Sequence, residues 1–398
     1  MNELYRKILI GSILLFLWCT PKEAWAQEQQ TEDGEAIVEA EELDEKGMLI
    51  ARALLEDMEI SKIQAEMDEL LQENSFSLEE TITAMLHGEM PFTRENAEKL
   101  IKEALFSQLS EQKKVMLNAL LLIIVSALLT NFSSIFKNGQ IGEISFYMVY
   151  MLLMALLIRS FGNVSAGIAA SLEQMVSFMR ILTPAYFLAI IAASGAGSAS
   201  VFYEMVLILI YIIQVLLENL FLPGIHVYVL LQLVNYLHKE DFLSKMAELM
   251  KTIIEWGLKS CMSILIGWQV VQTMIAPALD SLKRTFLGKT AGAIPGIGDV
   301  MDGAFQVAVG TAVLVRNCLG AAAIVICLIL FLTPMIRLGI ITLLYKFLAA
   351  ISQPVSDKRM VGCLSTVADG YVLLLRVLVT AEIVSIVTIA ILATSFFH

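Results

Sequence analysis

The stretch FLGKTAGAIPGIGDVMDGAFQVAVGTAVLVRN, residues 286–317, lies between long apolar runs and is itself rich in Gly and Ala. In a bilayer, backbone outside helices and closed sheets must be buried in protein or line water. The Pro-Gly-Ile-Gly turn at residues 295–298 interrupts any helix, and the small residues around it allow helices to approach closely. Two interpretations stay open, a polar or re-entrant hinge leading into a membrane helix and an ordinary loop. The candidate hinge residues are Pro295, Gly296, Gly298 and Asp299.

Two nucleotide-binding patterns fail in this stretch. Gly288 and the Lys-Thr pair after it end like a P-loop, but Lys283 stands where that pattern needs its first Gly. Gly296 and Gly298 begin a dinucleotide fingerprint, but Met301 replaces its third Gly and no βαβ alternation surrounds it. The sequence therefore excludes both nucleotide sites.

The composition predicts an integral membrane protein. Of 398 residues, 57% are hydrophobic and only 17% are charged, whereas a soluble domain is about half apolar and about a quarter charged. The net charge of −12 is concentrated between residues 27 and 114, which marks a separate soluble region. A surface of that charge disfavours nucleic acid.

The N-terminal third predicts three segments outside the cytoplasm. Residues 1–26 have a basic start, a short apolar core and an Ala-Trp-Ala site, which is typical of a cleaved signal peptide. Residues 27–46 are acidic and poor in large apolar side chains, so we expect disorder. Residues 47–114 carry amphipathic helical patterns and predict a small extracytoplasmic helical domain, whose apolar stripes are core rather than a partner groove.

From residue 115 the apolar runs predict an all-α polytopic membrane domain, residues 115–398, with six to eight crossings. The runs at 181–194 and 336–351 are shorter than the roughly 20 residues of a crossing, which leaves the number open. We expect a break at Thr333-Pro334 and another at the Ser-Gly-Ala-Gly-Ser run, residues 194–198. The candidate crossings are 115–135, 144–161, 181–194, 201–222, 258–276, 306–332, 336–351 and 371–397.

The basic residues give an orientation for an eight-crossing arrangement. With the N-terminal domain outside, Lys137, the Lys283 loop and the segment from Lys346 to Arg359 lie on the cytoplasmic side, as the positive-inside tendency requires. Lys245 and its neighbours then lie outside, together with several acidic residues. This arrangement predicts an extracytoplasmic C-terminus.

Ionisable residues within the apolar runs are the candidates for a polar seam, because each needs a partner or water inside a membrane. Glu204 and Glu218 are fourteen residues apart and share one helix face. A seam of this kind could conduct a solute or ions, or it could be a set of buried pairs that hold the helices together. The candidates are Glu204, Glu218, Arg316, Arg376 and Glu382.

No catalytic, cofactor or metal site is predicted. The four histidines, His87, His226, His238 and His398, are scattered and fit no metal-ligand spacing. The five cysteines include no CxxC pair. The sequence argues against an enzyme.

Three stretches resemble one protein family. They are LTPAYFLAIIAASGAGSAS at 182–200, KTAGAIPGIGDVMDGAF at 289–305 and SDKRMVGCLSTVADGYVLLLRVL at 356–378. Together with the signal peptide and the polytopic region, they resemble stage III sporulation protein AE of endospore-forming Firmicutes. The resemblance covers nearly the whole chain and is strongest from residue 182 onward.

The resemblance implies a component of the mother-cell membrane around the forespore. It also implies as partners the other stage III A sporulation proteins, with a separate ATPase subunit, and a forespore membrane protein. Together these form a channel-like or secretion-like complex that maintains the forespore and its late gene expression. A different class of function, a stand-alone secondary transporter or permease, stays open. It would be expected to show inverted repeats with broken helices, and no convincing repeat surrounds Gly195 and Gly296.

Overall fold

The computed structural model describes residues 64, 82, 113–128, 139–194, 199–238, 240–291 and 298–394, all within the compact unit Gly47–His398. The signal peptide and acidic segment predicted at 1–26 and 27–46 lie outside the described residues, as does nearly all of the helical domain predicted at 47–114. The elements in the described ranges are helices, which agrees with the predicted all-α class.

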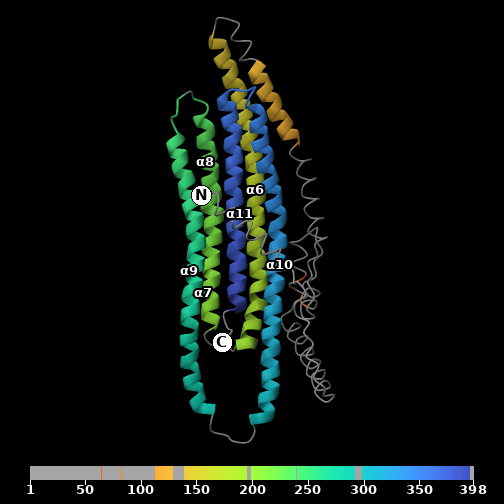
Figure 1. Cartoon of the computed structure of the whole chain (residues 1–398), viewed down its shortest axis with the longest axis vertical. Helices are drawn as coiled ribbons and strands as arrows, with labels where there is room; N and C mark the ends of the chain where they lie inside the picture. Colours follow the sequence, from red (N-terminus) through yellow and green to blue (C-terminus); the bar gives the residue numbers. More distant parts are fainter. Residues whose placement is uncertain are drawn as a thin grey trace, which may run out of the picture. The chain divides into compact units, whose positions relative to one another are not determined.

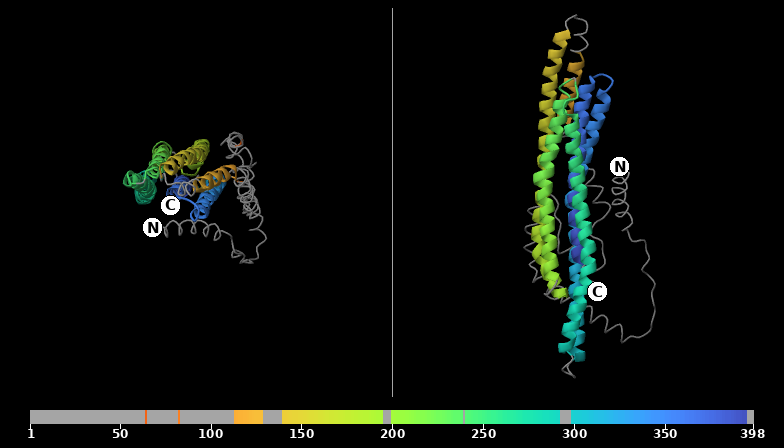
Figure 2. Two further views of the ribbon diagram at one scale, coloured as in Figure 1. Left: turned by 90° about the horizontal axis from the view of Figure 1, so that it is seen from above. Right: turned by 90° about the vertical axis from the view of Figure 1, so that its left-hand side faces the viewer.

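In the described ranges, five long helical passes form an antiparallel bundle (Figure 1). Successive passes run in opposite directions (Figures 1 and 2). The second pass is continuous, because α7 leads through a π-helix into α8. The elements are α6 (Gly139–Ser194), α7 (Ala199–Leu216), the π-helix Leu217–Phe221, α8 (Leu222–Asn235), α9 (Ser244–Ala291), α10 (Gly298–Ser352) and α11 (Lys358–Thr394).

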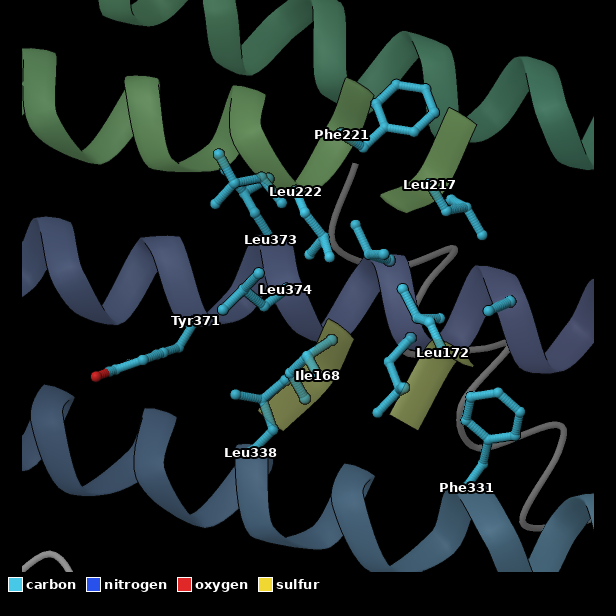
Figure 3. Packing of buried hydrophobic residues seen from close by; sticks show 14 of the residues in the cluster. Ile168, Leu172, Leu217, Phe221, Leu222, Phe331, Leu338, Tyr371, Leu373 and Leu374 are labelled. Carbon is cyan, nitrogen blue, oxygen red and sulfur yellow. The ribbon is translucent and has the colours of Figure 1, made fainter. Parts of the chain in front are cut away.

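The last helix, α11, is the centre of this bundle. It packs against α6, α7, α8, α9 and α10, and Figure 3 shows Leu373 and Leu374 of α11 among side chains of its neighbours. Between residues 358 and 390, only Lys358 and Ser365 of α11 are exposed. A helix that is apolar on all sides must be buried on all sides, in protein or lipid. Here neighbouring helices bury it.

Glycines bring α11 close to α8. A Cβ placed on Gly370 would lie 2.6 Å from Val229 Cγ2 and 2.8 Å from Phe161 Cε2. A Cβ on Gly362 would lie 2.5 Å from the ring of Tyr236. Small residues of this kind allow backbones to approach closely, which is how helices associate where lipid removes the hydrophobic driving force.

Two prolines lie inside helices, and one of them corrects a prediction. The break expected at Thr333-Pro334 is wrong, because α10 continues through Pro334 to Ser352. α6 likewise contains Pro184, and the hydroxyl of Thr183 donates to the Met179 carbonyl 2.6 Å away. A proline removes one backbone hydrogen bond, and packing of α10 against α11 and α6 outweighs that loss.

Four described stretches are long and apolar enough to cross a membrane. Because α6 and α10 are continuous, the runs predicted at 144–161 and 181–194 share one helix, as do those at 306–332 and 336–351. The larger number of six to eight crossings stays a prediction for the whole chain. The four stretches are Glu143–Pro184, Leu207–Asn235, Gly310–Ser352 and Lys358–Ala390.

Contacts at the helix ends also correct one part of the predicted eight-crossing arrangement. The Tyr150 hydroxyl donates to the Leu233 carbonyl at 2.5 Å, and the Arg359 guanidinium lies 3.6 Å from the centre of the Phe146 ring. The start of α6, the α8–α9 turn and the α10–α11 turn therefore lie at one end of the bundle. The eight-crossing arrangement placed the last two on opposite sides of the membrane, which the structure contradicts.

The π-helix has a local cause. Pro223 has no N–H, and its ring would clash with the carbonyl four residues earlier in a regular α-turn. The preceding turn widens instead, and the Leu222 N–H donates to the Leu217 carbonyl. At the other end of α8, the Asn235 side chain accepts hydrogen bonds from the N–H groups of Phe242 and Leu243, which closes the turn into α9.

Candidate functional site: polar contacts between the helices

Two tyrosines and a serine form a buried cluster between three helices. Ser160 Oγ of α6 lies 2.9 Å from the Tyr345 hydroxyl of α10 and 3.5 Å from the Tyr371 hydroxyl of α11. The two tyrosine rings pack edge to face, with centres 5.1 Å apart. Figure 3 shows the Tyr371 side chain leaving α11 on the side of α10. Buried hydroxyls need partners, and this tyrosine cluster supplies them across helices that are far apart in sequence.

A histidine on α8 continues this cluster. His226 Nε2 lies 2.7 Å from Ser165 Oγ of α6. The ring of Phe161 packs against both His226, at 5.2 Å, and Tyr371, at 5.3 Å. His226 thus lies inside a candidate crossing and contacts α6, and it is not the scattered solvated residue that the sequence suggested.

An ion pair joins α9 to the central helix. Arg376 Nη1 of α11 lies 2.5 Å from Glu255 Oε1 of α9, and both side chains are mostly buried, at 21% and 15% exposure. A second pair on α9, between Lys245 and Glu248, is exposed and local. The hydrogen bond from Lys245 lowers the pKa of the Glu248 carboxyl. Only the first pair therefore links two helices.

Arg316 and Glu382 occupy two further interfaces. Arg316 of α10 is 1% exposed and interacts electrostatically with Tyr186 of α6. Glu382 of α11 is partly buried and lies near Cys327 of α10. Since Arg376 faces α9, the structure does not bring Arg316, Arg376 and Glu382 together in one row. The candidate seam residues with described side chains are distributed over separate helix contacts.

The other candidates lie at helix ends or outside the described residues. Glu218 is exposed in the π-helix. Glu204 lies on α7, where only the backbone is described. Gly298 and Asp299 begin α10, while Pro295 and Gly296 lie between the end of α9 and the start of α10, outside the described residues. α9 ends and α10 begins on either side of the predicted turn, and the hinge and loop interpretations both stay open.

Many hydroxyls in the apolar helices are satisfied within their own helix. They donate to the carbonyl four residues earlier and so need neither water nor a ligand. This group comprises Thr342, Ser352, Thr380, Ser385 and Thr388. The polar contacts between helices are accordingly concentrated in the tyrosine cluster, His226 and the arginines.

The described residues hold no arrangement typical of a small-molecule site. A hollow of about 460 Å³ lies on the outer side of α9 and is lined by Trp256, Lys259, Ser260, Ser263 and Ile264. All five residues come from one helix, so the hollow is a surface feature. Among the described residues, no three His, Cys, Asp or Glu side chains gather as metal ligands would.

Sequence reasoning missed several of these contacts. The sequence suggested a loop around Glu255, because three lysines and three other acidic residues accompany it in the segment after Asn235. Ser160, Tyr345 and Tyr371 gave no signal, because a lone hydroxyl in an apolar run is common. One signal could have placed Glu255 in a helix. It is the regular spacing of polar residues, Glu255 among them, that is typical of an amphipathic helix.

Comparison with known proteins agrees with the resemblance in sequence. The family model for stage III sporulation protein AE matches residues 76–395. Stage III sporulation protein AE of Bacillus subtilis (strain 168) is 24% identical over 353 residues, which is 87% of this chain and 88% of that protein. No solved structure matches. The family match covers every described helical pass, and the chain belongs to the stage III sporulation protein AE family.

Proposed function

We propose that this protein is a membrane subunit of the channel-like or secretion-like complex that links mother cell and forespore at stage III of sporulation. The observation that carries the proposal is the family match over residues 76–395, which includes the whole helical bundle. A role in sporulation follows from membership of the family, and the bundle contributes the membrane-spanning part. The proposed site is the mother-cell membrane around the forespore.

The bundle favours a structural and conducting role over catalysis. α11 is held by the tyrosine cluster, by the Arg376–Glu255 pair and by close packing at Gly370, so α6, α8, α9 and α10 are each fixed to it. Such a framework suits a subunit that must hold its position in a large assembly. We propose that the other stage III A proteins, with their separate ATPase subunit, and a forespore membrane protein are its partners.

A stand-alone secondary transporter is the alternative, and the helices give it less support. Transporters of that class place their substrate at paired, discontinuous helices near the bilayer midplane. α6 and α10 instead continue through Pro184 and Pro334. The π-helix after α7 is the irregular element within the described passes, and it has no counterpart among them.

A clean deletion in the source organism, or in a tractable spore former with this gene, tests the proposal. Microscopy through sporulation should find normal vegetative growth, complete engulfment and then forespores that stall and shrink. Re-expression of the chain in the mother cell should restore spores, and re-expression in the forespore should not. Normal spores together with a defect in growing cells would instead support the alternative function, a stand-alone secondary transporter.

A further inference from the structure

The outer face of α6 changes character after Leu152, in the first third of the helix. From Ile144 to Leu152 its exposed side chains are large and apolar, namely Ile144, Tyr147, Met148, Met151 and Leu152. Between Leu152 and Leu188, which are about 54 Å apart along the helix, α6 has no described side chain that is at once large, apolar and exposed. Apart from Ala155 and Pro184, which lie near the two ends of this stretch, the exposed residues there are all small or polar: Arg159, Asn163, Ala166, Gly167, Ala170, Glu173, Gln174 and Arg180. We call these eight residues the polar face of α6.

The polar face continues the line of the apolar residues above it. Exposed positions recur every three or four residues from Ile144 to Gln174, and Arg180 follows Glu173 by seven residues, which is about two turns along the same side of a helix. One side of α6 is therefore apolar at first and polar further along. The same side of the helix faces outward throughout. All of it lies within the candidate crossing Glu143–Pro184.

The charged side chains of the polar face indicate which environment it contacts. Arg159, Glu173 and Arg180 are exposed, and no ion pair involves them within the described ranges. Ionisable groups at the lipid surface of a crossing are costly, and arginine alone can extend toward the interface. Glu173 has no ion-pair partner among the described residues. Water is the environment that satisfies all three.

A hydrogen bond fixes the level of the polar face against its neighbour. Ser165 of α6 bonds His226 of α8, so the next residues, Ala166 and Val227, lie at the same height in the bundle. Val227 is 44% exposed and belongs to the apolar outer face of α8, together with Leu230 at 43%. At one height, the bundle thus presents a polar face on α6 and an apolar face on α8.

We propose that the polar face of α6 lines an aqueous conduit at the level where the α8 face contacts lipid. The inference rests on the proposed function, and it names the surface of the subunit that water reaches. A single bundle cannot enclose this face, because it is exposed on the outside of α6. Further copies of the chain or partner subunits complete the conduit around it.

Thiol labelling in membrane vesicles tests the inference on the full-length chain. Ala166→Cys and Ala170→Cys place a thiol on the polar face, and Ala155→Cys is the matched control on the same outer face, three residues after Leu152 and outside the polar face. Val227→Cys is the control at the height of Ala166. The wild-type chain is the blank, because its described cysteines, Cys261, Cys318, Cys327 and Cys363, are buried. A charged, membrane-impermeant maleimide is added to vesicles of both orientations, and labelling after denaturation checks that each thiol is intact.

The expected result is labelling of Ala166→Cys and Ala170→Cys that is about tenfold or more faster than labelling of Ala155→Cys and Val227→Cys, because thiolates form in water and not in lipid. Equal labelling of Ala166→Cys and Val227→Cys would place this level outside the bilayer and overturn the conduit. Absence of labelling at Ala166→Cys and Ala170→Cys would also overturn it, since lipid or protein then covers the face. A deletion strain that sporulates normally would refute the proposed function without changing the labelling result.

Discussion

Arg376 of the central helix α11 forms an ion pair with Glu255 of α9, with 2.5 Å between Nη1 and Oε1 across 121 residues of sequence. Both side chains are mostly buried, so neither charge has ready access to water if the other is removed. The pair therefore fixes α9, which carries charges along its first turns, to the most buried helix of the bundle.

The first prediction concerns this pair. Arg376→Leu should destabilise the bundle by about 3 kcal/mol, the lower end of the range for breaking a buried pair, because Glu255 keeps a desolvated charge. Arg376→Leu combined with Glu255→Leu should recover most of the loss. Thermal unfolding of the purified protein in detergent measures both. The exposed Lys245–Glu248 pair supplies the control, since Lys245→Leu should leave the unfolding temperature unchanged. An equal effect of Arg376→Leu and Lys245→Leu would contradict the prediction.

The second prediction concerns close packing at Gly370. Gly370→Ala should cost about 1–3 kcal/mol, because its Cβ would overlap Val229 and Phe161 and force α8 or α6 away from α11. Gly339→Ala in α10 is the matched control. A Cβ at Gly339 meets nothing within 4 Å, and Ala is the better helix former, so stability should be unchanged or slightly higher. Unfolding midpoints in detergent compare the two. A neutral Gly370→Ala would show that α8 and α11 can separate without cost.

The third prediction separates the two tyrosines of the buried cluster. Tyr345→Phe removes the partner that lies 2.9 Å from Ser160 Oγ, whereas Tyr371→Phe removes the partner at 3.5 Å. Tyr345→Phe should therefore cost about 1 kcal/mol and Tyr371→Phe less, because the shorter contact is the stronger hydrogen bond. Both variants retain the ring packing, so differences in unfolding temperature report the hydroxyls alone. The reverse order would assign the main hydrogen bond of Ser160 to Tyr371.

The helical membrane class was predictable because composition and apolar runs determine it, and so was the end of α6 at Ser194, where a Gly-rich run follows. The continuity through Pro334 was not predictable, because the proline is visible in sequence and the packing that outweighs it is not. The partner of Arg376 could not be found for a similar reason. In the sequence, Glu255 lies in an amphipathic segment whose charges suggest a loop. Its pairing with Arg376 depends on the packing of α9 beside α11, which the sequence does not show.

The fourth prediction concerns Arg316, a fully buried cation of α10. Arg316→Leu should leave membrane abundance unchanged, because an apolar side chain removes the cost of burying a charge. If Arg316 has a functional role, spore formation should nevertheless fall in a strain that carries only this variant. Cys318→Ala, two residues further along the same buried helix, is the control and should sporulate normally. Normal sporulation of Arg316→Leu at normal abundance would leave Arg316 with a structural role alone.

The fifth prediction concerns the side of the membrane on which the turns lie. Tyr150 contacts Leu233 and Arg359 contacts Phe146, so the α8–α9 turn and the α10–α11 turn share one end of the bundle. Glu240→Cys and Val355→Cys, both exposed in those turns, should therefore react with an impermeant thiol reagent from the same side of the membrane. Gly197→Cys, in the connection that follows α6, should react from the opposite side. Right-side-out and inverted vesicles distinguish the two sides. Reaction of Glu240→Cys and Val355→Cys from opposite sides would contradict the placement of both turns at one end of the bundle.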